Sequence, residues 1–384
     1  MPRATSVRRT AEAVGISQDE LGPRLRNAVP GRLGGCFVVA LIPAHNEEAG
    51  ITETVLSLRA QTSPPDAIVV MADNCSDETV ARAKAAGAWV CPTVGNTAKK
   101  AGALNQGLTA ILPALAPGDF VLCQDADGQL EPHFLVEALR TFTMVDGLGG
   151  LSGAVVARSA TNRLETAQAI EYARGMRLMS RAGGRVHVLS GAATLFPVHA
   201  LLAIAQHRGD DLPGTHGQVF LEDSLTEDYE LTLAMKKLDF ACRSTKRCRV
   251  VTDLMPTLRD LKVQRIRWFR GALESMWLYG FNRRTAKTWC GIAWTFLVSL
   301  MFPATVAVLV TSWFLWGMMP DFRYALLFPV FAAEGVVTAR RIDRRARVMA
   351  TLFIPLWCYD NFMFALYWTA LWQASRKGAR VWIT

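Results

Sequence analysis

The sequence lacks cysteines and histidines at the spacings typical of disulfide frameworks or zinc sites. Its eight cysteines are scattered, with no CxxC pair, and no histidines stand beside them at zinc-site spacing. The pattern argues against a disulfide framework and against a zinc module. It predicts reduced cysteines that pack inside a cytoplasmic protein. Internal repeats and low-complexity tracts are also absent.

The first 35 residues lack an apolar run long enough for a signal peptide or a membrane-spanning helix. They form a basic N-terminal extension, and we expect the domain that follows to remain in the cytoplasm. The arginines of this extension are Arg3, Arg8, Arg9, Arg24, Arg26 and Arg32.

The net charge of +9 could indicate nucleic acid, anionic lipid or a phosphorylated substrate as a partner. Basic residues cluster at 340–347 and 376–380, beside apolar segments. That placement favours anionic membrane lipid. No nucleic-acid-binding module or aromatic-interleaved basic groove is recognisable, so we expect no nucleic-acid partner. The sequence leaves an oligomer possible.

The apolar residues are unevenly distributed over the 384-residue chain, whose length favours two structural units. Most of the apolar excess follows residue 285. Residues 289–319 carry no charge and exceed the roughly 20 residues that one span needs, whereas 324–339 and 348–372 are apolar segments with few charges. The C-terminal part is therefore predicted to be an α-helical membrane region with three segments, at least one of them re-entrant, paired or interfacial.

Before this region, short β-branched apolar runs alternate with helical patterns. Strands are predicted at 36–43, 67–71, 88–91 and 120–124, and helices at 47–60, 77–86 and 101–115. This alternation predicts an α/β, Rossmann-like doubly wound sheet that binds ligands at the carboxyl ends of its strands. Asp73 and Asp125 fall at such ends.

The pattern then becomes mixed. A strand is predicted at 149–158 and another at 186–196, interrupted by Gly191, with a polar loop at 207–220. Helices are predicted at 165–182, 224–235 and 262–278.

Asp125-Ala126-Asp127 follows an apolar strand, where two carboxylates can project into a crevice. A divalent cation there would neutralise a bound diphosphate, and Mg²⁺ or Mn²⁺ suits oxygen ligands. A solvated turn is the alternative interpretation.

Thr226-Glu227-Asp228 stands at the start of a predicted helix. Helix capping explains Thr followed by acids. An acid at this point would also suit deprotonation of an attacking hydroxyl.

Gln264, Arg267 and Trp268 lie three and four residues apart and so share one face of a helix. Such a face could present an amide, a cation and an aromatic ring to a sugar or a diphosphate. An aromatic residue at a membrane interface, flanked by arginines, is the alternative.

The order of these motifs resembles the family 2 inverting glycosyltransferases, and most of all their membrane-bound branch of cellulose, hyaluronan and poly-N-acetylglucosamine synthases. The resemblance covers roughly residues 36–280. Its motifs are Pro43-Ala44-His45-Asn46-Glu47, Asp73, Lys100 to Asn105, Asp125 to Asp127, Thr226 to Asp228 and Gln264 to Trp268.

The resemblance implies a GT-A fold that binds a UDP-sugar and assigns a role to each motif. Asp228, supported by Glu227 and Asp125, would be catalytic, and Asp127 with Asp125 would hold the metal. Ser190 and Gly191, together with Trp268, would face the acceptor. The donor would contact Pro43, Ala44, Glu47, Asp73, Lys100, Asp125, Gln264, Arg267 and Trp268.

We therefore expect a basic extension at 1–35, a GT-A domain at 36–284 and a membrane-associated helical region at 285–384. The expected activity is metal-dependent, inverting transfer of a sugar from a UDP-sugar to a glycan or lipid-linked acceptor at the membrane, with Asp228 as general base. Two alternatives stay open: a polyprenyl-phosphate glycosyltransferase, and a non-catalytic membrane protein that binds nucleotide sugars.

Overall fold

The computed structural model describes residues 15–27, 35–317 and 327–376. The chain divides into two compact units, each built from several segments. The sheet unit comprises Met1–Ala154, Leu189–Glu222 and Phe240–Val251, and the helical unit comprises Val155–Val188, Asp223–Asp239 and Thr252–Thr384. This division does not follow the linear boundaries expected at residues 35 and 284.

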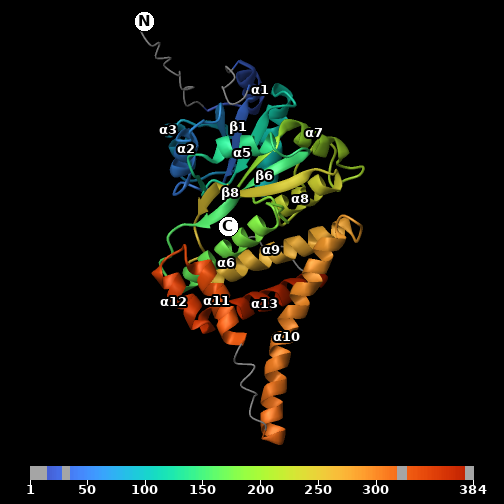
Figure 1. Cartoon of the computed structure of the whole chain (residues 1–384). Helices are drawn as coiled ribbons and strands as arrows, with labels where there is room; N and C mark the ends of the chain where they lie inside the picture. Colours follow the sequence, from blue (N-terminus) through green and yellow to red (C-terminus); the bar gives the residue numbers. More distant parts are fainter. Residues whose placement is uncertain (1–14, 28–34, 318–326, 377–384) are drawn as a thin grey trace. The chain divides into compact units, whose positions relative to one another are not determined.

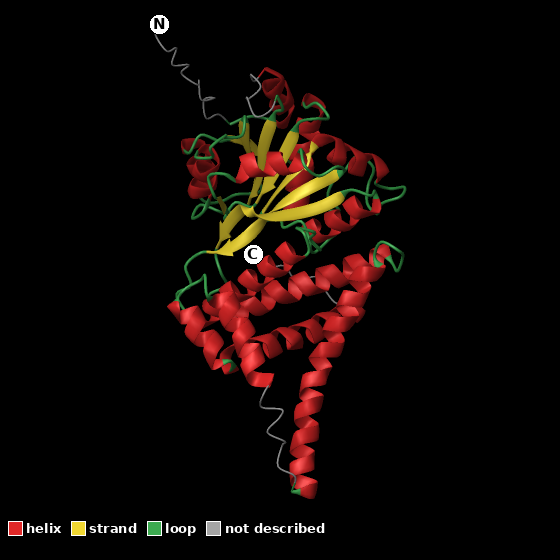
Figure 2. Ribbon diagram, in the orientation of Figure 1, coloured by secondary structure: helices red, strands yellow, loops and turns green. Residues whose placement is uncertain are grey.

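The sheet is parallel in its N-terminal half, as the alternating pattern predicted (Figure 2). Strands β1 (Val38–Ala44), β2 (Ala67–Ala72), β3 (Trp89–Pro92) and β4 (Phe120–Gln124) pair in the order β3-β2-β1-β4. Every residue of β1 and β2 is buried, which explains their unbroken apolar composition. Helices α2 (Ile51–Arg59), α3 (Thr79–Ala85) and α4 (Lys99–Ile111) connect them.

The other half of the sheet is antiparallel and was predicted only in part. Strand β7 (Ala193–Pro197) pairs with β4 and with β6 (Leu148–Ala157), and β8 (Ala241–Thr252) pairs with the short β5 (Gln129–Leu130). The strand predicted over 186–196 is wrong in its first half, because residues 186–192 are not in a strand. Two carbonyls there, those of Val186 and His187, accept hydrogen bonds from the Lys236 ammonium instead.

The described part of the N-terminal extension packs within the sheet unit. Helix α1 (Gln18–Asn27) contacts α4, and the Gln18 side chain donates a 2.7 Å hydrogen bond to Gln106. Gly15 forms a parallel bridge with Val90 of β3. The remaining helices of this unit are α5 (Phe134–Phe142) and α7 (Val198–His207).

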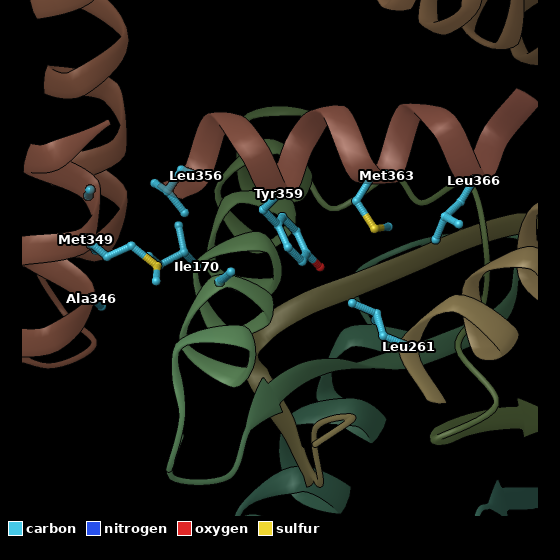
Figure 3. Packing of buried hydrophobic residues seen from close by; sticks show 11 residues of the cluster. Ile170, Leu261, Ala346, Met349, Leu356, Tyr359, Met363 and Leu366 are labelled. Carbon is cyan, nitrogen blue, oxygen red and sulfur yellow. The ribbon is translucent and has the colours of Figure 1, made fainter. Parts of the chain in front are cut away.

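The helical unit is built around α6 (Arg163–Arg181), α8 (Glu227–Lys237) and α9 (Leu258–Tyr279). Helices α11 (Leu327–Ala339), α12 (Arg344–Leu352) and α13 (Ile354–Ser375) share a core with α6 and α9 (Figure 3). This core includes Ile170, Leu261, Met349 and Leu366, so it crosses the boundary expected at residue 284.

Residues 289–319 were expected to form either one helix or a pair broken at Pro303. They lie mostly in one continuous helix, α10 (Ala286–Trp316; Figure 1), and its described side chains include many exposed apolar ones. The segment predicted at 348–372 is broken at Phe353, whose φ is +58°. Within the described residues no single helix has both the length and the apolar composition of a membrane span; α12 and α13 meet those criteria only as a pair bent by 81°.

Candidate functional site

The Asp125-Ala126-Asp127 segment follows β4 and is fixed through its backbone. The amide of Asp125 donates to the carbonyl of Ala192 at 3.2 Å, and the Thr54 hydroxyl donates to the carbonyl of Ala126 at 2.7 Å. A Cβ atom at Gly50 would lie 3.3 Å from the Cα of Asp127, so α2 begins directly against this turn. The backbone of the turn is therefore packed against β7 and α2, while the Asp127 side chain is exposed.

Lys100 lies beside the first aspartate. Its ammonium is 2.6 Å from Oδ1 of Asp125, and both side chains are partly exposed. The close start of α4 depends on Gly102, because a Cβ there would lie 2.0 Å from Oδ1 of Asn96. A cation and a carboxylate held together at the edge of the sheet can bind a polar ligand of either charge.

Glu47 follows β1 and shares this edge with the two aspartates. Burial, followed by the charges of Asp127, Asp125 and Asp77, raises the pKa of Glu47 to about 7. Three acids thus repel one another where the strands end. A bound cation would relieve that repulsion.

Asp73 follows β2 and has fixed partners. Its side chain is 7% exposed and accepts hydrogen bonds from the Thr93 hydroxyl at 2.8 Å and the Asn74 amide at 3.1 Å. The Asp73 carbonyl lies 2.6 Å from Nδ1 of His45. The motif that begins at Pro43 and Ala44, the last residues of β1, is thereby linked to the end of β2.

Ser190 and Gly191 precede β7. The next residue, Ala192, accepts the hydrogen bond from the Asp125 amide and so holds this segment near the aspartates. The Ser190 hydroxyl accepts from the amide of Ala192, and the Ser190 carbonyl accepts from the Thr194 hydroxyl at 2.8 Å. Sequence reasoning expected an interrupted strand here. The structure instead has an irregular segment that is held beside Asp125.

The acids of this edge suit a divalent cation that also binds a ligand phosphate. Among the described residues no group of three or more His, Cys, Asp or Glu side chains forms a complete metal cluster. Mg²⁺ commonly uses only one or two protein carboxylates together with substrate phosphates. Asp125 and Asp127, with the raised pKa of Glu47, fit that mode of binding.

The remaining candidate residues belong to the helical unit. Helix α8 was expected to begin at residue 224 with Thr226 as a capping side chain, but it begins at Glu227 and the Thr226 side chain makes no capping hydrogen bond. Glu227 is buried and Asp228 is half-buried, with Oδ1 of Asp228 accepting from the Tyr229 amide at 2.7 Å. Thr226 therefore occupies the N-cap position, as the capping interpretation predicted, but its hydroxyl does not make the predicted hydrogen bond.

On α9, Gln264, Arg267 and Trp268 are all half-buried, in agreement with a shared helical face. The Gln264 side-chain oxygen is buried without a hydrogen-bond partner in the described structure. The Trp268 ring lies 4.6 Å from the Arg265 guanidinium.

Arg265 belongs to the predicted motif at Gln264 to Trp268, but sequence reasoning gave it no role. It is 4% exposed and forms a bidentate ion pair with Glu171 of α6. The Tyr359 hydroxyl of α13 donates to the same carboxylate. Thr54 was also missed, although a buried threonine on an amphipathic helix is a recognisable sign of a specific hydrogen bond.

The family described as "Glycosyltransferase like family 2" matches residues 35–271. No curated protein sequence matches the chain. A solved mannosyltransferase from Pyrobaculum calidifontis, in complex with GDP-Man and Mn²⁺, is 16% identical, with 94% of this chain and 95% of that chain covered and a TM-score of 0.58. Glucosyl-3-phosphoglycerate synthase from Mycobacterium tuberculosis, in complex with Mn²⁺, UDP and phosphoglyceric acid, is 19% identical over 66% of this chain and 80% of that chain, with a TM-score of 0.41.

The first of these structures supports the expected Rossmann-like GT-A fold and, at its low identity, nothing further. The TM-score of the second is too low to carry an argument about this chain. The family match spans more than half of the sequence, and it includes the strand ends with Glu47, Asp73 and Asp125 as well as Gln264 to Trp268. The chain therefore belongs to the glycosyltransferase-like family 2.

Proposed function

We propose that this glycosyltransferase transfers a sugar from a UDP-sugar to a glycan or lipid-linked acceptor at a membrane, with inversion at the anomeric carbon and with Mg²⁺ or Mn²⁺ as cofactor. The observation that carries the proposal is the meeting of Glu47, Asp125 and Lys100 at the carboxyl edge of the parallel strands. Together with Asp127, which also faces Glu47, they place three acids and a lysine at one edge, and this set matches the needs of a diphosphate bound with a divalent cation.

Within the sheet unit, Asp73 and Glu47 would hold the nucleoside, and Lys100 would approach the diphosphate. Asp125 and Asp127 would hold the cation, which when bound stabilises the charge of the departing diphosphate. The ion pair between Lys100 and Asp125 orients both side chains before a donor binds.

Asp228 would take the proton of the acceptor hydroxyl as the sugar is transferred. A half-buried carboxylate that is held by the Tyr229 amide at 2.7 Å is oriented for this task. Gln264, Arg267 and Trp268 would contact the diphosphate and the acceptor. Inversion in a single displacement would give a β-linked product from an α-linked donor.

Membrane attachment is supported by the surface of the helical unit. On α10 Trp294 is 63% exposed and Phe314 is 77% exposed. Helix α12 lines a hollow of about 400 Å³ with Arg344, Arg347 and Val348, among others. Exposed apolar side chains next to arginines suit a lipid surface that carries negative charge. The catalytic domain would lie on the cytoplasmic side.

The test is a transfer assay with purified full-length protein, Mn²⁺, native membrane lipids and glycans, and a panel of labelled donors. The panel contains UDP-glucose, UDP-N-acetylglucosamine and, because the Pyrobaculum enzyme was solved with it, GDP-mannose. We expect transfer from a UDP-sugar that chelation of the metal abolishes. NMR of the product should show a β linkage.

Other outcomes separate the alternatives. A product that mild acid releases as free sugar would identify a polyprenyl-phosphate acceptor. Tight binding of UDP-sugars without hydrolysis or transfer would indicate a non-catalytic binding protein. Transfer only from GDP-mannose, or transfer that persists in a metal chelator, would overturn the proposed donor or cofactor.

A further inference from the structure

Helices α8 and α9 approach unusually closely at one glycine of the helical unit. Gly271 lies within α9, three residues after Trp268 and four after Arg267, and so continues the face that carries those side chains. A Cβ atom at Gly271 would lie 2.5 Å from Oγ1 and 2.7 Å from Cγ2 of Thr226. No side chain fits between α9 and the start of α8 without moving one of them.

The threonine that faces Gly271 makes no hydrogen bond through its side chain in the described structure. Thr226 is 6% exposed and stands at the N-cap of α8, but its hydroxyl does not make a capping hydrogen bond. Its methyl and hydroxyl groups only fill the space against Gly271. A glycine inside a helix lowers helix stability relative to alanine, so its presence here needs a packing reason.

A second contact joins the first turn of α8 to the C-terminal end of α9. The Tyr279 hydroxyl of α9 donates a 2.6 Å hydrogen bond to Oε1 of Glu230, a fully buried carboxylate one turn into α8. Gly271 and Tyr279 together set both the distance between the helices and the rotation of α8. Glu227 and Asp228 occupy the first turn of α8, between these two contacts.

We propose that Gly271 is a positioning residue that holds the carboxylate of Asp228 in register with the Gln264, Arg267 and Trp268 face. It touches neither substrate nor metal, and it acts through Thr226. This inference rests on the proposed function, because it assigns a consequence to the placement of Asp228. Enlarging Gly271 should therefore impair transfer while leaving donor binding by the sheet unit intact.

The experiment compares four full-length proteins: wild type, Gly271→Ala, Thr226→Ala, and the double variant. Gly175→Ala is the matched control, since Gly175 is also inside a helix but an added Cβ there meets nothing within 4 Å. We measure kcat and KM for transfer, and the affinity for UDP with Mn²⁺ by calorimetry.

We expect Gly271→Ala to lower kcat at least tenfold with UDP affinity unchanged, whereas Gly175→Ala behaves like wild type. Thr226→Ala removes the two atoms that collide without breaking a hydrogen bond, so the double variant should recover most of the lost kcat. Tyr279→Phe, which removes the second contact, should also lower kcat without changing UDP affinity.

Equal kcat for Gly271→Ala and wild type would overturn the inference. A loss that Thr226→Ala does not relieve, or one that appears equally in UDP affinity, would also overturn it, because the defect would then not lie in the placement of Asp228. Failure of the proposed function itself gives a different result: neither wild type nor Gly175→Ala would transfer a sugar from any donor.

Discussion

Asp127 offers the most direct test at the scale of single residues. Asp127→Ala should weaken Mn²⁺-dependent UDP binding by roughly 100-fold, or about 3 kcal/mol, because the diphosphate charge is then poorly compensated. Gln129→Ala is the control, since Gln129 joins the neighbouring β5 ladder through its backbone. Calorimetry with UDP, with and without Mn²⁺, measures the effect. Unchanged affinity would mean that the Asp-Ala-Asp segment is a structural turn.

Glu47 predicts a pH dependence for the same binding event. Its pKa of about 7 means that, without metal, the carboxyl is protonated below neutral pH. A cation favours the ionised form, so affinity for Mn²⁺ with UDP should rise as pH increases through about 7. The stability of the metal-free protein should change with pH in the opposite direction. The raised pKa of Glu47 stabilises the fold at low pH, and this contribution is lost as pH rises from about 4.5 past 7.

Glu47→Gln should flatten both profiles between pH 5 and 8, with calorimetry and thermal unfolding as the measurements. Gln keeps the shape of Glu47 and removes only its titration. If the variant retains the wild-type pH slopes, another acid of this edge carries the titration.

Asp228→Asn distinguishes two roles of Asp228, a general base and a residue that only stabilises the start of α8. Asn retains an Oδ1 atom to accept from the Tyr229 amide, so α8 should be preserved. Transfer should nevertheless fall by about 10² to 10⁴, the usual contribution of general base catalysis, while UDP binding survives. Single-turnover transfer with radiolabelled donor measures this. Near-normal transfer would remove Asp228 from the mechanism and favour a phosphate acceptor, whose oxygen is already anionic.

Predictions for single residues succeeded where the position of a residue follows from its own segment and failed where it depends on a distant one. Asp73 and Asp125 lie where the alternating pattern placed them, because burial of a parallel strand is recorded in its own composition. The Thr226 hydroxyl does not make the predicted capping bond, and a local capping rule cannot anticipate a neighbouring helix that crowds this side chain. The ion pair of Arg265 was missed because its partner, Glu171, is far away in the sequence.

At the scale of elements, α6, α9 and α13 are joined by a charged network in which Arg265 is buried and Glu171 is partly exposed. Arg265 donates to both carboxylate oxygens of Glu171 at 3.0 and 2.9 Å, and Tyr359 donates to the same group. Burying an ion pair is costly, but removing one partner leaves the other charge uncompensated. The network therefore fixes which faces of the three helices meet.

Arg265→Met should destabilise the protein by about 1.5 to 3 kcal/mol, because it removes two charged hydrogen bonds to a carboxylate that water can still reach, whereas Arg265→Met with Glu171→Met should lose much less. Chemical denaturation followed by circular dichroism measures the difference. The exposed pair of Arg158 and Asp253 is the control, and Arg158→Gln should cost no more than about 1 kcal/mol. A double variant as unstable as the single one would show that shape, and not charge pairing, sets this core.

Element boundaries were predicted well where both faces of an element are buried continuously, as in β4, whereas α9 begins at Leu258, one turn before its predicted start. They were missed where polarity alternates without a clear apolar face. Strand β8 is an example, because its exposed basic residues conceal the buried Cys248 and Val250. The break at Phe353 was also missed, since a single left-handed residue leaves no trace in an apolar run.

At the scale of the whole molecule, the apolar surface of α10 and the net charge of +9 predict adsorption to anionic membranes. Trp313, Phe314 and Leu315 are consecutive and each is more than half exposed, so α10 exposes apolar side chains on more than one face. Water contact over such a surface is unfavourable and lipid contact relieves it. Arg344 and Arg347 of α12 would add about 1 kcal/mol each on an anionic surface.

Flotation of full-length protein with vesicles tests the two contributions separately. Replacing Trp313, Phe314 and Leu315 with Ser should reduce binding to neutral and anionic vesicles alike. Replacing Val94 and Met144, exposed apolar residues of the sheet unit, with Ser should not. Arg344→Glu with Arg347→Glu should weaken binding to anionic vesicles at least tenfold and leave binding to neutral vesicles unchanged. Arg24→Glu with Arg26→Glu in α1 is the control, because it makes the same change in net charge and should not weaken binding. Wild-type protein that stays at the bottom of the gradient with every vesicle would contradict membrane attachment, and the exposed face of α10 would then require a protein partner.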